Sequence, residues 1–294
     1  MAQSNADSGE SAATTSLQPM RFTDLLDAAF SLYRNHFGLF LGISAVYCLP
    51  HIAFSASTHW VSEFCDFVLG ILCYGGLAYA SAEAYLGRRL TVRAVFSRVK
   101  DRMWPYLGST FFYGLAIFAV FGLFLIGSEL STTDKILLND EIGSLIVLPI
   151  AVSLMARWGL YAQTVLVEET SARDALRRSS ELVKGAWWRV FGVMFGIMLL
   201  SNIIELVLQI SSALIFALSG IAGEVDLMEM REVLWHNHRV EGVYHVWHAM
   251  TTAVETFTMP IAVIGFTLLY FDRRFRKEGF DIEMMVQNKE VGQF

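Results

Sequence analysis

Six long apolar stretches constrain this chain more than any other feature of its sequence. They cover residues 37–56, 67–86, 106–126, 144–167, 191–210 and 246–271. Crossing the roughly 30 Å hydrocarbon core of a bilayer takes about 20 mostly apolar residues in a helix, and a helix satisfies its own backbone hydrogen bonds in lipid. Only 17% of the residues are charged, against roughly 25% in an average soluble domain. We therefore predict an all-α polytopic membrane protein with six transmembrane helices, and we exclude a water-soluble globule.

The distribution of basic residues predicts how the spans are oriented. Six spans place both termini on one side of the membrane, and 19 of the 22 lysine and arginine residues fall on that side. Lys135, Arg231 and Arg239 are left for the opposite side, where acidic residues outnumber basic ones. Because basic loops stay in the cytoplasm, we predict that both termini are cytoplasmic.

Polar segments complete the predicted domain organisation. Residues 1–20 are rich in Ser, Ala and Thr and lack the parts of a signal peptide, which predicts a disordered tail. Residues 21–285 form the membrane domain, and residues 286–294 form a cytoplasmic tail. The apolar run 191–221 is longer than one crossing. It either breaks near its middle or, as we prefer, projects outward, with an external cap over residues 211–245.

The same module occurs three times in the sequence. Each copy begins with a hydroxyl residue that can cap a helix, at Thr23, Thr91 and Ser171, and continues through a basic amphipathic stretch. Apolar residues recur at helical spacing, with one polar exception at Ser179, as in helices that lie in the headgroup plane. We predict three hairpin repeats, each preceded by an amphipathic interfacial helix; a compositional likeness is the alternative. The repeats cover about residues 21–88, 89–168 and 169–285.

Three stretches of the chain resemble a known membrane family. They are RFTDLLDAAFSLYRNHFGLFL, ARWGLYAQTVLVEETSARDALRRSSELVKGAWWRVFGV and LLYFDRRFRKEGFDIEM. They are similar to the bacterial and archaeal integral-membrane family named for the glycerophosphoryl diester phosphodiesterase membrane domain. The resemblance implies a six-helix fold of undetermined activity in the cytoplasmic (inner) membrane of a prokaryote. It brings over no catalytic residue, and we expect no catalytic barrel beside the six spans.

Arg157 is the most unusual residue within an apolar stretch. It lies 11 residues before Glu168, about 16 Å along a helix and near the membrane midplane. An arginine there costs at least roughly 2.5–3.5 kcal/mol, so it should face the bundle interior. We predict an ion pair with Glu205, Glu255 or Glu83. The pair would form a site for an anionic ligand or a translocated ion, or alternatively would fix the helix register.

Basic and aromatic residues gather at the predicted cytoplasmic ends of the spans. Such clusters attract anionic lipid headgroups, although ordinary control of topology explains them equally well. The tryptophans Trp104, Trp187 and Trp188 are typical of interface anchors. The predicted headgroup residues are Arg88, Arg89, Arg177, Arg178, Arg273 and Arg274.

Two glycine pairs have GxxxG spacing near the starts of the first and fifth spans. They are Gly38 with Gly42 and Gly192 with Gly196. Small residues at this spacing let helix backbones approach closely. We predict close packing inside the bundle in preference to a dimer interface.

Histidines concentrate on the predicted external side. His245 and His248 share a helical face, and His236 and His238 precede them. Imidazoles bind zinc or copper, but no closed ligand set or general-base motif accompanies these four. They remain weak metal candidates, solvated histidines are favoured, and no cofactor is predicted. The three cysteines have unrelated spacings, which argues against a disulfide framework.

The sequence contains no nucleophile motif, phosphate loop or paired catalytic carboxylates in a soluble domain. We therefore expect no enzymatic activity, and nothing in the charge pattern points to nucleic acid. The favoured function is a scaffold or accessory subunit that engages membrane lipids and other membrane proteins. A transporter or channel for a small anionic solute or lipid, working through Arg157, is the alternative. A metal-binding external cap is a third possibility.

Overall fold

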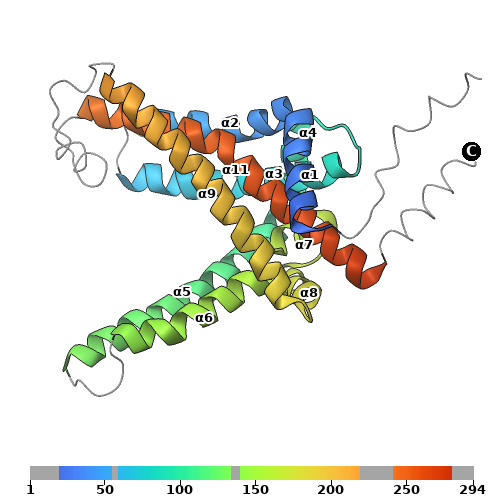
Figure 1. The fold of residues 1–294 in the computed structure, drawn as a ribbon, viewed down its shortest axis with the longest axis vertical. Helices are drawn as coiled ribbons and strands as arrows, with labels where there is room; N and C mark the ends of the chain where they lie inside the picture. The colour runs from blue at the N-terminus through green and yellow to red at the C-terminus, as the bar shows by residue number, and fades with distance from the viewer. Residues whose placement is uncertain (1–19, 55–58, 134–139, 219–240, 280–294) are drawn as a thin grey trace, which may run out of the picture.

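The computed structural model describes residues 20–54, 59–133, 140–218 and 241–279. All regular secondary structure in these residues is helical (Figure 1). The predicted N- and C-terminal tails, and most of the predicted external cap, lie outside the described residues. The helices are α1 (Phe22–Asn35), α2 (Phe37–Phe54), α3 (His59–Tyr85), α4 (Val92–Asp101), α5 (Met103–Thr133), α6 (Asp140–Trp158), α7 (Tyr161–Val167), α8 (Ala172–Val183), α9 (Trp187–Leu218) and α11 (Glu241–Glu278).

Five segments of the described helices are long and apolar enough to cross a membrane. They are Phe67–Tyr85, Met103–Gly122, Val147–Val167, Trp187–Ile215 and Ala249–Glu278. Helix α2, the first predicted span, contributes only the shorter apolar segment Phe37–Pro50. The expectation of an all-helical membrane protein is thus confirmed, and a sixth crossing stays a prediction. Helix α9 runs unbroken over 32 residues, so the alternative break near its middle is absent.

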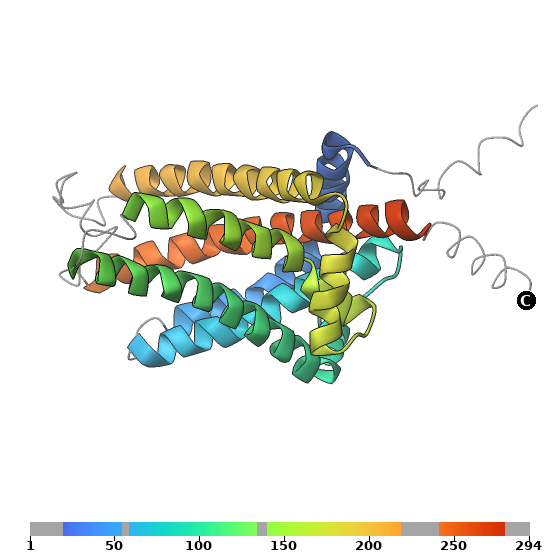
Figure 2. The ribbon, with the colours of Figure 1, turned by 90° about the horizontal axis from the view of Figure 1, so that it is seen from below.

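The long helices pair as neighbours along the chain. Helix α2 packs on α3, α5 on α6, and α9 on α11, and α11 also packs along α2 and α3. The α5–α6 pair diverges from the other long helices (Figure 1) and joins them mainly through α7 and α8. Helices α1, α4 and α8 gather at one end of the bundle (Figure 2). The largest fully buried side chains include Leu77, Leu160, Leu182 and Leu268, so the core lies where α3, α8 and α11 meet the α6–α7 connection.

The three short helices correspond to the three predicted amphipathic stretches. Thr91 accepts a hydrogen bond from the Ala94 N–H at 3.3 Å, and Ser171 accepts one from the Asp174 N–H at 3.4 Å, so both act as N-caps. The cap predicted at Thr23 is wrong. Helix α1 already begins at Phe22, and the N–H of its N-cap residue Arg21 donates to the Asp24 carboxylate at 3.0 Å.

Each short helix begins against a glycine of another hairpin. A Cβ built on the glycine would lie 2.9 Å from Val92 at Gly42, 3.0 Å from Ala172 at Gly108, and 2.6 Å from Phe22 at Gly196. Gly42 and Gly196 are therefore each covered by a side chain of a short helix, and the predicted close approach of two helix backbones stays a prediction. Gly38 and Gly192 have no described atom within 4 Å of such a Cβ.

Candidate functional site

Arg157 does not occupy the interior position that the sequence predicts. It lies in the last turn of α6, where its side chain is exposed, and it forms no ion pair with any described residue. The prediction counted its depth along one straight helix from Glu168. The helix instead ends at Trp158, and the chain turns at Gly159 and Leu160 before α7 begins.

The predicted acidic partners of Arg157 lie elsewhere. The Glu83 carboxylate is 3.0 Å from the Arg88 guanidinium at the end of α3. The Glu205 carboxylate accepts a hydrogen bond from Gln209 in its own helix at 2.8 Å, and Glu255 is partly buried in α11. The structure brings none of these three carboxylates into an ion pair with Arg157.

The turn between α6 and α7 is stabilised by Ser179 of α8. Its buried hydroxyl donates to the Arg157 carbonyl at 2.8 Å and accepts from the Leu160 N–H at 3.3 Å. A break in a helix leaves backbone groups without partners, and buried backbone groups need one. This explains the one polar residue in the apolar stripe of α8, from which the break could have been anticipated.

Glu168 organises an ion-pair network where α7, α8 and α11 meet. Its carboxylate accepts hydrogen bonds from the Arg178 Nε and from the Tyr270 hydroxyl, both at 2.7 Å. Arg274 approaches Glu168 to 3.5 Å, and Arg178 also donates to Glu278 at 2.7 Å. Burial lowers the pKa of the Arg178 guanidinium, but its hydrogen bonds to Glu278 and Glu168 outweigh this effect and hold the pKa above its ordinary value.

Two further carboxylates connect the remaining short helices. Asp272 of α11 is buried, accepts from the Met20 N–H at 2.9 Å, and pairs with Arg276 and Arg189. Glu169 lies between α7 and α8 in a left-handed conformation with φ of 58°. It forms ion pairs with Arg98 and Arg102 near the end of α4. These charged groups therefore tie the start of α1 to α9 and α11, and α4 to the connection between α7 and α8.

The structure divides the six predicted headgroup arginines into two groups. Arg88, Arg89 and Arg177 are exposed, as the prediction requires. Arg178 and Arg274 belong to the Glu168 network, and buried Arg273 donates to the Leu182 carbonyl at 3.1 Å. The guanidinium groups of these last three bond other parts of the protein, and headgroup contact stays a prediction for all six.

The histidine candidates lie largely beyond what the structure describes. His236 and His238 fall outside the described residues, and only the backbone is described at His245 and His248. In the described parts of the chain, no three His, Cys, Asp or Glu side chains are grouped to hold a metal ion.

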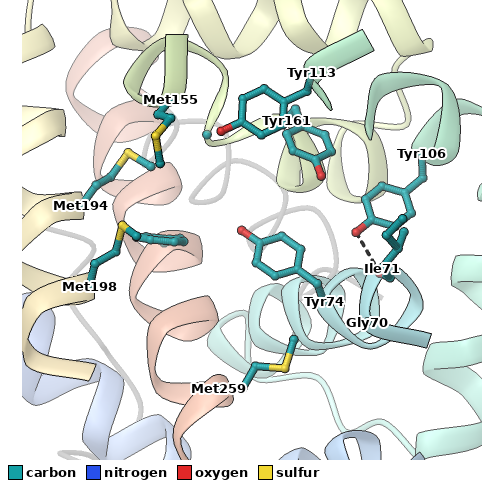
Figure 3. A pocket seen from close by; sticks show the side chains of 12 residues that line it. Gly70, Ile71, Tyr74, Tyr106, Tyr113, Met155, Tyr161, Met194, Met198 and Met259 are labelled. Atoms are coloured by element: carbon teal, nitrogen blue, oxygen red, sulfur yellow. Dashed lines mark hydrogen bonds between the residues drawn. The ribbon is translucent and has the colours of Figure 1, made fainter. Parts of the chain in front are cut away.

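A cavity of about 440 Å³ lies between the α5–α6 pair and the other long helices. Figure 3 shows Met155, Met194 and Met198 across the cavity from Tyr106. The Tyr106 hydroxyl donates to the Ile71 carbonyl at 3.0 Å. The sequence did not predict this cavity, because its residues come from helices far apart in the chain. The lining consists of Gly70, Ile71, Tyr74, Tyr106, Tyr113, Met155, Gly159, Tyr161, Met194, Met198, Met259 and Phe266.

The residues matched by a known family include most of these features. The family described as Domain of unknown function (DUF8558) matches residues 51–222, more than half of the chain. The chain belongs to this family. The DUF8558 match includes α3 to α9, with the Ser179 turn and the tyrosine side of the cavity, and excludes α1 and α11. No match was found among curated proteins or solved structures. The resemblance to the phosphodiesterase-associated membrane family stays a prediction.

Proposed function

We propose that this DUF8558 protein is a non-enzymatic, multi-pass scaffold or accessory subunit of a prokaryotic cytoplasmic membrane. Its short helices α1, α4 and α8 would engage lipids and partner proteins. The proposal rests on what the charged side chains at this end of the bundle bond to. Glu168, Glu169 and Asp272 each bond a basic residue of a neighbouring helix, which is a structural use of charge.

The same proposal includes six spans arranged as three hairpin repeats. Its support is a cyclic pattern, in which each short helix begins on a glycine in the first long helix of the preceding hairpin. Helix α4 meets α2, α8 meets α5, and α1 meets α9. A pattern of this kind is expected for parallel repeats around an axis along the membrane normal.

Transport through an Arg157 ion pair is the weaker alternative. Arg157 does not line the cavity, and it lies on the exposed side of α6. We therefore base no pathway on it.

The predicted orientation leads to a labelling experiment. In a chain whose native cysteines are replaced by serine, Ser97→Cys on the exposed side of α4 should be cytoplasmic. A membrane-impermeant maleimide should then react with it only after the cells are opened, because the bilayer blocks charged reagents. Lys135→Cys, between α5 and α6, should react in intact cells. Equal labelling of the two positions in intact cells would contradict the orientation.

Lipid engagement predicts a change in the lipids that copurify. Combined Arg88→Gln, Arg89→Gln and Arg177→Gln substitutions should lower the enrichment of anionic lipid by at least about tenfold, since each basic residue contributes about 1 kcal/mol of attraction. The measurement is mass spectrometry of lipids and proteins retained after purification from native membranes. The matched control replaces the same three arginines by lysine, which keeps the charge and should keep the enrichment. Unchanged lipid in the glutamine variant, with no retained partner protein, would refute the proposal.

A further inference from the structure

The cavity beside the α5–α6 pair has the chemistry of a ligand site. We propose that it binds an uncharged membrane lipid that carries hydrogen-bond-accepting carbonyl oxygens at its polar end. This inference does not depend on the scaffold function, because it uses none of the residues at the cytoplasmic end of the bundle.

The depth of the cavity indicates where its occupant comes from. Tyr106 and Tyr113 lie about 5 and 15 Å along α5 from its first residue, and Met198 lies about 17 Å along α9 from its first residue, at 1.5 Å per residue. These positions are in the half of membrane-spanning-length segments that lies nearer to α4 and α8. Molecules that reach the cavity from the side are therefore lipids or other molecules dissolved in the membrane.

The charge of the lining selects an uncharged ligand. All twelve lining residues are uncharged. A buried ionic group without a partner carries a large desolvation penalty. An anionic phosphate group is therefore a poor fit to the cavity, in contrast to the exposed arginines at the cytoplasmic end.

The two sides of the cavity differ in what they offer a ligand. Figure 3 shows the hydroxyls of Tyr74 and Tyr113 directed into the open space. The Tyr113 hydroxyl makes no hydrogen bond to any residue in the described ranges, so its proton is available to an acceptor. A phenolic hydroxyl donates one hydrogen bond, and a carbonyl oxygen is the matching acceptor in a neutral lipid.

Methionines form the opposite side, at Met155, Met194 and Met198. Their thioethers are flexible and polarisable, and they adapt to apolar chains and to flat rings. The volume of about 440 Å³ lies in the range of roughly 300–1,000 Å³ typical of small-molecule sites. It accommodates the polar end and the first part of one chain, and the remainder of the chain would stay in the bilayer.

The test uses the full chain in phosphatidylcholine nanodiscs and native mass spectrometry. Three probes are titrated: a benzoquinone with a decyl tail, dioctanoylglycerol, and the anionic dioctanoyl phosphatidylglycerol. We expect saturable binding, one molecule per chain, of the quinone, the diacylglycerol or both. Binding of the quinone alone would identify ring carbonyls as the acceptors that the site recognises. Binding of the diacylglycerol alone would identify ester carbonyls. Tyr113→Phe should weaken binding about fivefold, the equivalent of about 1 kcal/mol for one hydrogen bond. Tyr74→Phe should weaken it less, because the Tyr74 hydroxyl also meets the Gln163 side chain.

A matched pair of substitutions tests the location. Met198→Trp should fill the cavity and abolish binding, whereas Leu199→Trp, at a neighbouring residue that is 50% exposed and outside the lining, should leave it unchanged. Equal thermal unfolding midpoints would show that the variants fold. No saturable binding of either neutral probe would overturn the proposal. So would equally tight binding of the anionic probe, or binding that survives both Met198→Trp and the tyrosine substitutions.

Discussion

Replacing Glu168 by glutamine should lower the free energy of unfolding by about 2–3 kcal/mol, less than the roughly 3–5 kcal/mol for breaking a fully buried ion pair. The substitution keeps the shape of the side chain but removes the charge that faces Arg178 and Arg274, and it weakens the acceptor for Tyr270. The Glu168 side chain is only 12% exposed. The expected loss lies below that range because the Arg178 side chain is 26% exposed and keeps Glu278 as a second partner.

Glu181→Gln is the matched control for this experiment. Glu181 pairs with Arg177 one helical turn away in α8, and their side chains are 48% and 78% exposed. Solvent screens such a pair, so we expect a loss within about 0.5 kcal/mol. Denaturant unfolding in one detergent would compare the two variants. If both lost the same stability, the Glu168 network would not be what joins α7, α8 and α11.

Replacing Gly75 by alanine should destabilise the protein by about 1–2 kcal/mol, after allowance for the higher helix propensity of alanine. The added Cβ would lie 2.8 Å from Cε1 and 3.0 Å from Cζ of Tyr106. That ring is buried, and its hydroxyl is held by the Ile71 carbonyl. Since the ring cannot move away without losing this hydrogen bond, the overlap must be relieved by separating α3 from α5.

Gly70→Ala, in the same helix, gives the comparison. The nearest atom to its new Cβ is Tyr47 Cε2 at 3.9 Å, an ordinary contact. Replacing a helical glycine without overlap should stabilise the chain by up to about 1 kcal/mol. Thermal unfolding of both variants in the same detergent measures the difference. A Gly75→Ala midpoint as high as that of Gly70→Ala would show that the Tyr106 ring does not lie against α3 at Gly75.

Local patterns predicted the elements of this fold well. The amphipathic stretches expected after Thr91 and Ser171 are helices α4 and α8, which begin at Val92 and Ala172. Long apolar runs became long helices, with α9 continuous through Leu218. These features depend on spacing along the chain, so they can be read without knowing which helices touch.

Contacts between distant segments could not be read in that way. The depth of Arg157 depended on whether α6 continued past Gly159, and the turn that ends it is held by a hydroxyl on another helix, Ser179. The same limit applies to Arg178, which is as basic as exposed Arg177 beside it but faces Glu168 and Glu278. Composition cannot distinguish these neighbours, because only packing decides which guanidinium group meets a carboxylate.

By itself, the sequence determined that this DUF8558 chain is a helical membrane protein with short basic helices between its long ones. The physical reason is that hydrophobic length and helical periodicity are local properties that act before any tertiary contact forms. Only the tertiary structure decided that α5 and α6 diverge from the other helices and leave a cavity lined by tyrosine and methionine. That cavity depends on how six helix segments approach one another in space, and no single stretch of sequence encodes such an arrangement.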